Sequence, residues 1–372
     1  MSYRFRTQFT VRSLGGSTLL IAILSCTQAT RTGVESARPS LGAAGALLSN
    51  IGNATKGIFE TQTVSLALDR IDQRNLPLDH TYRRSGSGQG VTVYVFDGGV
   101  LDSHPELEGR VRKGYDAFPS DPRVCNAHGT AVAGAIAGKT LGVAPRADIV
   151  DVKMVECTRL RGTIKAIVEG TLWVLEDHKR HGGGPAVANW SFIADTSSHI
   201  PQLDSAVSEL RAAGIPVIVS AGNIEINACR VSPGNAAGSI VVGASAISRE
   251  PGESKVTDRR AINTAWGPCI DVYAPGDSVL LPSFDSSRSP SVQLWNGTSM
   301  SAGYVSGAVA LYLESNPKAM PDDVLAYIRS SATPNVVKDT NSPFSYLLYV
   351  GQMREQMRSV EEIRAAQLAK RR

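Results

Sequence analysis

The central part of the chain lacks an excess of positive charge, although the formal net charge of the whole sequence is +4. The first 30 residues carry +3 and residues 351–372 carry another +3, which leaves −2 for the residues between them. A nucleic-acid-binding domain is expected to carry a basic stripe on its folded surface. The sequence therefore excludes a nucleic acid as the partner.

Long apolar runs are also scarce. One lies at residues 14–24, behind a short basic region that contains Arg4, Arg6 and Arg12. It is too short to span a bilayer but has the length of the apolar part of a secretory signal. We therefore expect residues 1–26 to be a signal peptide, the protein to be exported, and no other segment to cross a membrane.

Two processing routes fit the end of this run. The segment Ile23-Leu24-Ser25-Cys26 resembles a bacterial lipoprotein box, in which a lipid on Cys26 anchors the mature protein to a membrane. Leu24 is not the ideal residue at the second position of that box, and ordinary signal cleavage near Ala29 is the alternative. The expected location is accordingly secreted, periplasmic or at the cell surface.

Composition divides the remaining chain into three parts. Residues 27–62 are rich in Ala, Gly, Ser and Thr with little periodicity, which is typical of a linker or a short pro-region. Residues 63–350 have the pattern of one globular domain. Residues 351–372 are charged and Ala-rich, and we expect an exposed helix or a disordered tail there.

Short, nearly continuous apolar runs recur within the globular part. Runs of this kind indicate strands buried on both faces, as in a parallel sheet. Helical patterns lie between them, so the sequence predicts an α/β fold, a three-layer αβα sandwich with a mostly parallel central sheet. The runs are at residues 91–96, 147–154, 186–190, 214–220 and 239–243, and the helical patterns at residues 129–137, 163–180, 203–213 and 300–313.

Four polar residues lie at expected strand ends and helix starts, which are the positions where ligands bind to a sheet of this kind. Asp97 follows one expected strand and Asn223 another, while His128 and Ser299 lie at expected helix starts. Hydrolysis of an amide through a serine needs a hydroxyl, an imidazole to take its proton, a carboxylate to orient the imidazole, and a donor for the oxyanion. Each residue alone is explained as a helix cap, a core histidine or a turn former, and only their combination indicates this chemistry.

Sequence motifs spread over residues 64–345 carry a family resemblance. They are Leu68-Asp-Arg-Ile-Asp-Gln-Arg-Asn-Leu-Pro-Leu-Asp79, Ser103-His-Pro-Glu-Leu-Glu-Gly109, Ser220-Ala-Gly-Asn223, Tyr273-Ala-Pro-Gly276 and Gly297-Thr-Ser-Met300. With the order Asp, His, Ser that subtilisin also has, the chain resembles the proteinase K and aqualysin branch of the subtilases.

The resemblance implies a serine endopeptidase that cleaves polypeptides through an acyl-enzyme and needs no catalytic cofactor. Ser299 would be the nucleophile and His128 the general base and then acid. Asp97 would orient the imidazole, and the Asn223 amide with the Ser299 backbone N–H would form the oxyanion hole. We expect a monomer. The alternative is a catalytically impaired binding protein that keeps the subtilase fold.

Four cysteines remain beyond Cys26, and an even set in an exported chain predicts disulfide bridges. The aqualysin-like pattern implies that Cys125 pairs with Cys157 and Cys229 with Cys269. Reduced thiols are the alternative for a cytosolic chain.

The resemblance further implies a structural calcium ion. Relatives of proteinase K hold calcium with one aspartate and two backbone carbonyls, and Asp271 with the carbonyls of Ala237 and Ser239 occupy those positions here. Such oxygen ligands suit calcium. A solvated surface aspartate is the alternative.

Two segments are expected to form the peptide-binding channel. Family members have Ser-Leu-Gly-Gly where this chain has Ser191-Phe-Ile-Ala194, so the Ile193 and Ala194 side chains would narrow the channel. Arg159 and Arg161 on the opposite edge would favour acidic or small residues upstream of the cleaved bond, although a solvated charge pair is the alternative. The residues expected to bind substrate are Arg159, Leu160, Arg161, Gly162, Ser191, Phe192, Ile193, Ala221 and Gly222.

Overall fold

The computed structural model describes residues 20–22, 58–194, 199–249 and 254–351. Most of the expected signal peptide, the candidate lipidation site Cys26 and the expected tail after Gly351 lie outside the described residues. Among the described helices, none combines the length and hydropathy needed to cross a membrane.

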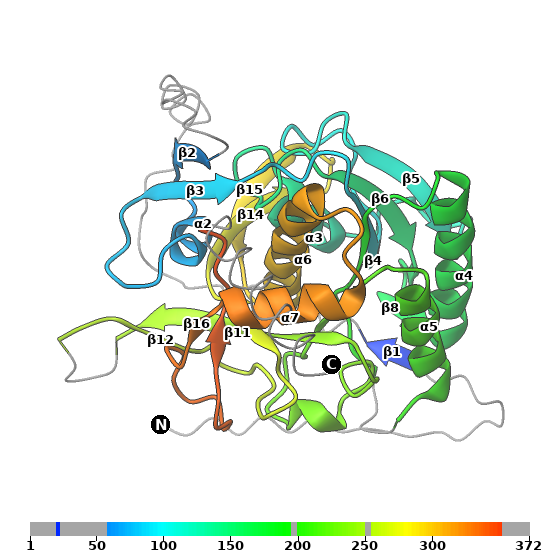
Figure 1. Cartoon of the computed structure of the whole chain (residues 1–372). Coiled ribbons are helices and arrows are strands. Elements are labelled where there is room, and N and C mark those ends of the chain that lie inside the picture. Colours follow the sequence, from blue (N-terminus) through cyan, green and yellow to red (C-terminus); the bar gives the residue numbers. More distant parts are fainter. Residues whose placement is uncertain (1–19, 23–57, 195–198, 250–253, 352–372) are drawn as a thin grey trace, which may run out of the picture.

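A ten-stranded sheet forms the middle layer of the molecule (Figure 1). The strand order is β16-β17-β13-β11-β10-β9-β4-β6-β5, with β12 paired to β11. All pairs are parallel except β11–β12 and β16–β17. The strands are β4 (Thr92–Asp97), β5 (Val111–Asp116), β6 (Asp148–Lys153), β9 (Ala186–Trp190), β10 (Val217–Ser220), β11 (Ile240–Ser248), β12 (Thr257–Arg260), β13 (Val272–Pro275), β16 (Thr333–Pro334) and β17 (Tyr346–Leu347).

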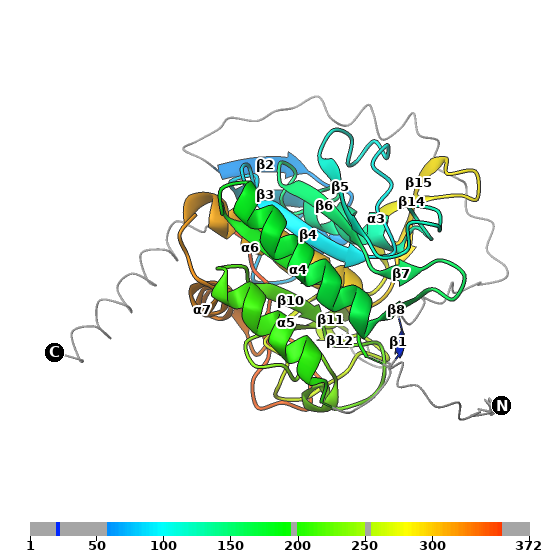
Figure 2. The same ribbon diagram turned by 90° about the vertical axis from the view of Figure 1, so that its right-hand side faces the viewer.

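Helices cover both faces of this sheet. One face carries α3 (His128–Ala137) and α6 (Thr298–Ser315), and the other carries α4 (Ile164–Arg180) and α5 (Pro201–Ala212), which lie side by side in Figure 2. The short helices are α2 (Leu66–Ile71), the 3₁₀ turn η1 (Ala228–Arg230) and α7 (Pro321–Ser331).

Strand β4 explains why two cores form. Val93 and Val95 belong to the core that contains α3 and α6, whereas Tyr94 and Phe96 belong to the core that contains α4 and α5. Successive side chains of a strand point to opposite faces, so an uninterrupted apolar strand needs a helix layer on each side. The predicted αβα sandwich with a mostly parallel sheet is therefore confirmed.

Glycines let α6 pack closely against α3. A Cβ atom at Gly303 would lie 2.9 Å from the Cβ of Ala135, and one at Gly307 would lie 2.9 Å from the Ile136 carbonyl oxygen. Side chains at these two positions would push the helices apart. Helix α6 carries the candidate nucleophile in its first turn, so this packing also fixes where that residue lies relative to α3.

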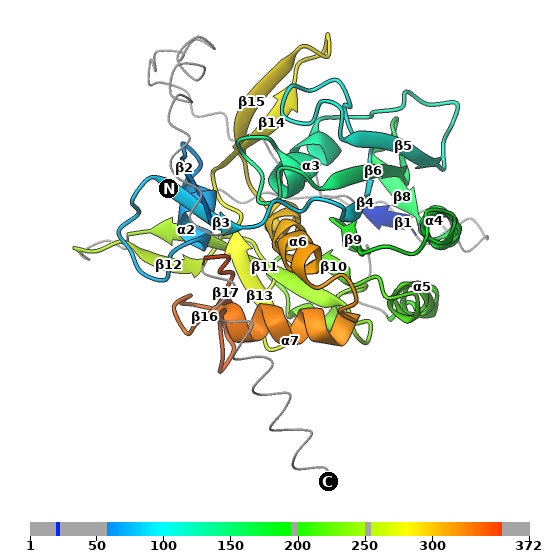
Figure 3. The same cartoon turned by 45° about the horizontal axis from the view of Figure 1, so that its top comes forward.

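Three smaller strand groups lie outside the main sheet. A hairpin of β14 (Val279–Phe284) and β15 (Pro290–Trp295) projects beside α3 (Figure 3). Strand β8 (Arg161–Thr163) pairs antiparallel with β7 (Val155–Glu156) and with β1 (Leu20–Ala22). The third group pairs β2 (Ile58–Gln62) with β3 (Thr81–Ser85).

Strand β2 lies at the end of the expected linker or pro-region, residues 27–62. Residues 58–62 form this strand and pair with β3 along its whole length. The guanidinium of Arg84 lies 4.6 Å from the centre of the Phe59 ring, and Arg83 pairs with Glu60 at 3.3 Å. This part of the segment is therefore attached to the strand that follows α2.

Candidate active site

Asp97 and His128 form a buried pair at the carboxyl end of the sheet. Asp97 is the last residue of β4, and His128 is the first residue of α3. Nδ1 of His128 lies 2.8 Å from Oδ2 and 3.0 Å from Oδ1 of Asp97, and Oδ1 also accepts the N–H of Gly98 at 2.7 Å. Because Nδ1 faces the carboxylate, it carries the imidazole proton, and Nε2 is left as the basic nitrogen.

A glycine after His128 makes this approach possible. A Cβ atom at Gly129 would lie 2.5 Å from the carbonyl oxygen of Gly99 and 3.1 Å from the Cβ of Asp97. Gly99 itself has a φ of 100°, a backbone conformation that residues with a Cβ atom rarely adopt. The two glycines bring the end of β4 and the start of α3 together.

The charge of Asp97 controls the protonation of His128. Burial by itself lowers the pKa of His128, because it penalises the charged imidazolium. The negative charge of Asp97 and its hydrogen bond outweigh burial and raise the pKa of His128 above its ordinary value. The pair therefore favours an imidazolium, which is the state that forms after proton abstraction.

Ser299 lies in the first turn of α6 and is buried. Its Oγ donates to the carbonyl oxygen of Ser191 at 3.3 Å, and Oγ of Ser191 donates to the carbonyl oxygen of Ser299 at 3.1 Å. Among the described residues, no hydrogen bond joins Ser299 to His128; in free hydrolases that bond is often long and tightens when substrate binds. The helix N-terminus favours negative charge beside the serine.

Thr298 orients the Asn223 amide toward this serine. Oδ1 of Asn223 accepts the backbone N–H of Thr298 at 2.8 Å and its hydroxyl at 2.9 Å. Because a backbone N–H can only donate, the amide oxygen must face Thr298, and Nδ2 is left to donate elsewhere. The sequence analysis placed Asn223 correctly beside the nucleophile motif but missed the residue that orients it.

A buried polar chain supports the nucleophile from behind. Oγ of Ser306 donates to Oδ1 of Asn189 at 2.9 Å, and Nδ2 of Asn189 donates to Oγ of Ser191 at 2.9 Å. Ser191 in turn holds the backbone of Ser299. Sequence reasoning missed this role; the available signal was a lone polar residue inside an apolar strand and another inside an apolar helix.

Trp295, the last residue of β15, also went unnoticed in the sequence. Its ring lies edge-on to the His128 ring, with the two centres 6.3 Å apart, and it is 8% exposed. The indole therefore covers one side of the imidazole and limits its contact with water.

The Arg159–Gly162 edge is formed by the turn before β8 and by β8 itself. Arg159 and Arg161 are exposed, and Arg159 pairs with Glu156 at 3.3 Å. Leu160 has a φ of 51° at the tip of the turn. Gly162 is buried against Met154, whose Sδ would lie 2.7 Å from an added Cβ.

The segment after β9 forms the other expected edge. Phe192 is 2% exposed and stacks on Trp190 with the ring centres 5.4 Å apart, so its side chain belongs to the core and leaves only its backbone for a substrate. Ala221 is buried too, and its N–H donates to Val242 within the sheet. Ile193 and Gly222 lie in contact with each other.

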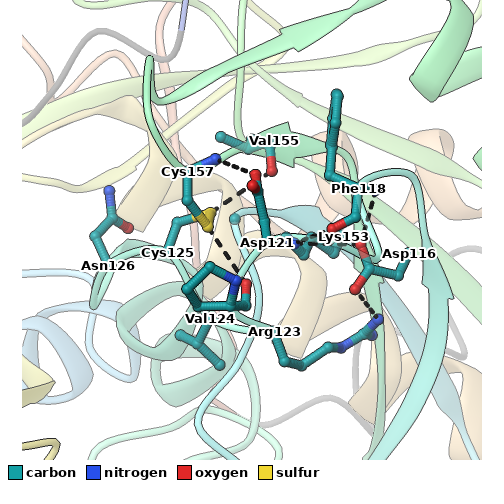
Figure 4. Close-up of a disulfide and its surroundings, with 12 residues drawn as sticks. Asp116, Phe118, Asp121, Arg123, Val124, Cys125, Asn126, Lys153, Val155 and Cys157 are labelled. Atoms are coloured by element: carbon teal, nitrogen blue, oxygen red, sulfur yellow. Dashed lines mark hydrogen bonds and ion pairs between the residues drawn. A yellow bond between two sulfur atoms is a disulfide. The ribbon is translucent and has the colours of Figure 1, made fainter.

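Both disulfides that the resemblance implied are formed, Cys125–Cys157 and Cys229–Cys269. The first bridge joins the segment before α3 to the segment before β8 (Figure 4). The N–H of Cys125 donates to the Gly98 carbonyl at 2.8 Å, next to Asp97. The bridge thus connects the neighbourhood of the Asp97–His128 pair with the Arg159–Gly162 edge.

The residues at the expected calcium site do not fit a calcium ion. One oxygen of Asp271 accepts the N–H of Val241 at 2.8 Å, and the other is bound by the guanidinium of Arg329. Both carboxylate oxygens of Asp271 are therefore already engaged by donors of the protein itself.

A second guanidinium lies beside the two expected carbonyls. Nη1 of Arg211 donates to the carbonyl oxygen of Gly238, between Ala237 and Ser239, at 2.9 Å. The expected set of Asp271, Ala237 and Ser239 is better described as an arginine-paired site.

The family model described as Subtilase family matches residues 88–346. The chain is 41% identical over 286 residues to an extracellular serine proteinase of Thermus sp. (strain Rt41A), an alignment that covers 76% of this chain and 65% of the relative. It is 38% identical to alkaline serine exoprotease A of Vibrio alginolyticus, covering 76% of this chain and 49% of the relative. The chain thus spans less than two thirds of the length of each of these relatives.

Solved structures agree with this relationship. A cold-adapted subtilisin-like serine proteinase superposes with a TM-score of 0.67 at 35% identity, covering 78% of this chain and 99% of that one. Fervidolysin from Fervidobacterium pennivorans, at 24% identity and a TM-score of 0.57 over 66% of this chain and 39% of its own, shares the fold. The chain belongs to the subtilase family.

Proposed function

We propose that the domain from β2 to Val350 is a serine endopeptidase that cleaves peptide bonds through an acyl-enzyme. The observation that carries this proposal is the buried Asp97–His128 pair, whose Nδ1 and Oδ2 are 2.8 Å apart; Ser299 in the first turn of α6 and the Asn223 amide bound to Thr298 support it. Each group needed for acyl transfer is present, and each is held by a hydrogen bond to a neighbouring element.

In the proposed reaction, Oγ of Ser299 attacks the carbonyl carbon while Nε2 of His128 takes the hydroxyl proton. The Asp97 carboxylate stabilises the imidazolium, and Nδ2 of Asn223 with the Ser299 N–H binds the oxyanion. His128 then gives its proton to the leaving amine, which departs and leaves an acyl group on Ser299. A water molecule deacylates the enzyme by the same two proton transfers in reverse order.

The proposed substrates are polypeptides that bind in an extended form. Strand β8 supports this, because it pairs with an additional antiparallel strand, β1, on its free edge. The same backbone groups would pair with a substrate strand. Exposed Arg159 and Arg161 would favour acidic or small residues upstream of the cleaved bond, and charge reversal at both positions should then change the cleavage profile.

Export is part of the proposal. It rests on the signal-like residues 1–26, on the two disulfides, and on the extracellular location in the name of the Thermus relative. The mass of the mature N-terminus distinguishes a lipid on Cys26 from cleavage near Ala29. The proposed enzyme is a monomer, and Arg329 rather than calcium neutralises Asp271 in it.

A fluorophosphonate probe tests the catalytic proposal directly. Residues 27–372 are expressed in an oxidising compartment and compared with Ser299→Ala. Labelling that disappears in Ser299→Ala supports an assembled nucleophile, base and oxyanion hole. A folded protein that is not labelled would instead favour the catalytically impaired binding protein.

A further inference from the structure

The side chain of Ile193 packs directly over Gly222, beside the candidate nucleophile. A Cβ atom at Gly222 would lie 3.0 Å from Cδ1 and 3.2 Å from Cγ2 of Ile193, and Gly222 has a φ of 105°. Ile193 is only 5% exposed. This isoleucine therefore spans the distance between two chain segments, the one after β9 and the one after β10.

Both of these segments contact the first turn of α6. The carbonyl of Ser191 accepts the Ser299 hydroxyl at 3.3 Å, and the N–H of Gly222 donates to the Thr298 hydroxyl at 3.2 Å. Ile193 lies two residues beyond the first contact and touches the second segment itself. Its side chain thus lies between two segments that each contact the first turn of α6.

The chemistry of acyl transfer fixes where the substrate residue must lie. Its carbonyl carbon has to approach Oγ of Ser299 to about 3–3.5 Å, with its oxygen toward Nδ2 of Asn223. The Cα atom is bonded to that carbon at about 1.5 Å, so the side chain begins within about 5 Å of Ser299. The space available to it is bounded by the segments that contain Ile193 and Gly222.

Hydrogen bonds hold the backbone on both sides of the Ile193–Gly222 contact. The N–H of Ala194 donates to the Ser232 carbonyl at 2.8 Å, and the N–H of Ala265 donates to the Gly222 carbonyl at 2.9 Å. Ile193 is β-branched and has few rotamers, so it cannot fold away without moving one of these segments. The bulk beside Gly222 is a fixed feature of the site.

From this geometry we infer that Ile193 determines specificity by restricting the substrate residue before the cleaved bond to Gly or Ala. The inference rests on the proposed peptidase function and names the substrate class that it acts on. A large aromatic or branched side chain would meet the isoleucine before its carbonyl reached Ser299.

Peptide p-nitroanilides that differ only in that residue, Ala-Ala-Pro-Xaa with Xaa as Ala, Leu or Phe, test the inference. Wild-type protein is expected to cleave the Ala substrate with a kcat/KM at least about 10-fold above that for Phe. Ile193→Gly is expected to raise the Phe-to-Ala ratio of kcat/KM by about 10- to 200-fold, the range for a single methylene group too many in a pocket. Ile193→Leu, which keeps the number of carbon atoms, is the matched control and should retain the wild-type ratio.

Fluorophosphonate labelling of each variant separates this inference from the proposed function. Wild-type protein that is labelled but cleaves Phe as well as Ala overturns the role of Ile193. So does an unchanged Phe-to-Ala ratio in labelled Ile193→Gly, or in labelled Ile193→Ala if the glycine variant fails to fold. Folded wild-type protein that is not labelled overturns the peptidase proposal, and the inference with it.

Discussion

Removal of the Cys125–Cys157 bridge is expected to weaken both the fold and the catalytic step. The bridge closes a loop with a sequence separation of 32 residues, for which the loss of loop-closure entropy predicts about 4 kcal/mol of stability. In a domain of this size 1 kcal/mol corresponds to about 2–4 °C, so the double variant Cys125→Ala/Cys157→Ala should unfold about 8–16 °C lower.

The second bridge provides the matched control. Cys229–Cys269 has a sequence separation of 40 residues, so the same calculation again gives about 4 kcal/mol. The closed loop of the first bridge contains His128, however, and ends just before β8. Only the first double variant should therefore lose turnover well below its unfolding temperature.

Calorimetry in a Ser299→Ala background, where self-cleavage is prevented, measures the stability of both double variants. Peptide turnover at 25 °C measures activity in the active background. Equal losses of turnover in the two variants would refute the coupling between the Cys125–Cys157 bridge and the site. A change in stability below about 1 kcal/mol would refute the entropic estimate itself.

The remaining predictions concern single residues. Asn223→Ala is expected to lower kcat by about 100- to 1000-fold with little change in KM, because one oxyanion donor is lost; steady-state kinetics with an unchanged kcat would contradict its role. The pKa of His128 is raised, so the acid limb of kcat/KM is expected above about pH 6.5, because catalysis needs the neutral base. The charged Asp97–His128 pair stabilises the fold below that pH, and this contribution is lost as the pH rises through the pKa of His128 in the folded protein. Asp97→Asn should lower kcat by about 10⁴-fold. It should also move the acid limb to lower pH, because burial then lowers the pKa of His128 with no opposing charge; an acid limb that stays in place would contradict the coupling between Asp97 and His128. Because Arg329 occupies Asp271, wild-type protein and Asp271→Asn should show the same change in unfolding temperature on adding millimolar calcium, and a larger response in the wild type would reject the arginine-paired site.

The layers of the fold, and the strand ends and helix starts at which the candidate catalytic residues lie, were accessible from sequence because their signals are local. The apolar run that becomes β4 indicates a strand buried on both faces, and Asp97 stands at its end in the sequence as it does in space. Gly303 and Gly307 lie four residues apart in the sequence, a spacing that is typical of a close helix contact, and the structure forms this contact with α3.

Other parts depend on contacts between residues far apart in the chain. Arg329 and Asp271 are separated by 58 residues, and no pattern around either one indicates that they meet. Phe192 was expected to line the peptide-binding channel. Its ring instead stacks on the neighbouring Trp190 and lies in the core. In the sequence, Thr298 is explained fully as a residue at a helix start. Only the structure shows its two hydrogen bonds to Asn223.

The pairing of Arg329 with Asp271 bears on how the fold responds to dissolved ions. A bound ion stabilises a fold by an amount that rises with the logarithm of its free concentration, so the fold becomes less stable wherever the ion is scarce or chelated. A guanidinium attached to the same chain has a fixed local concentration that the surroundings cannot dilute. At this position the stability of the domain therefore does not depend on the supply of a bound calcium ion, although dissolved salt screens the half-exposed pair.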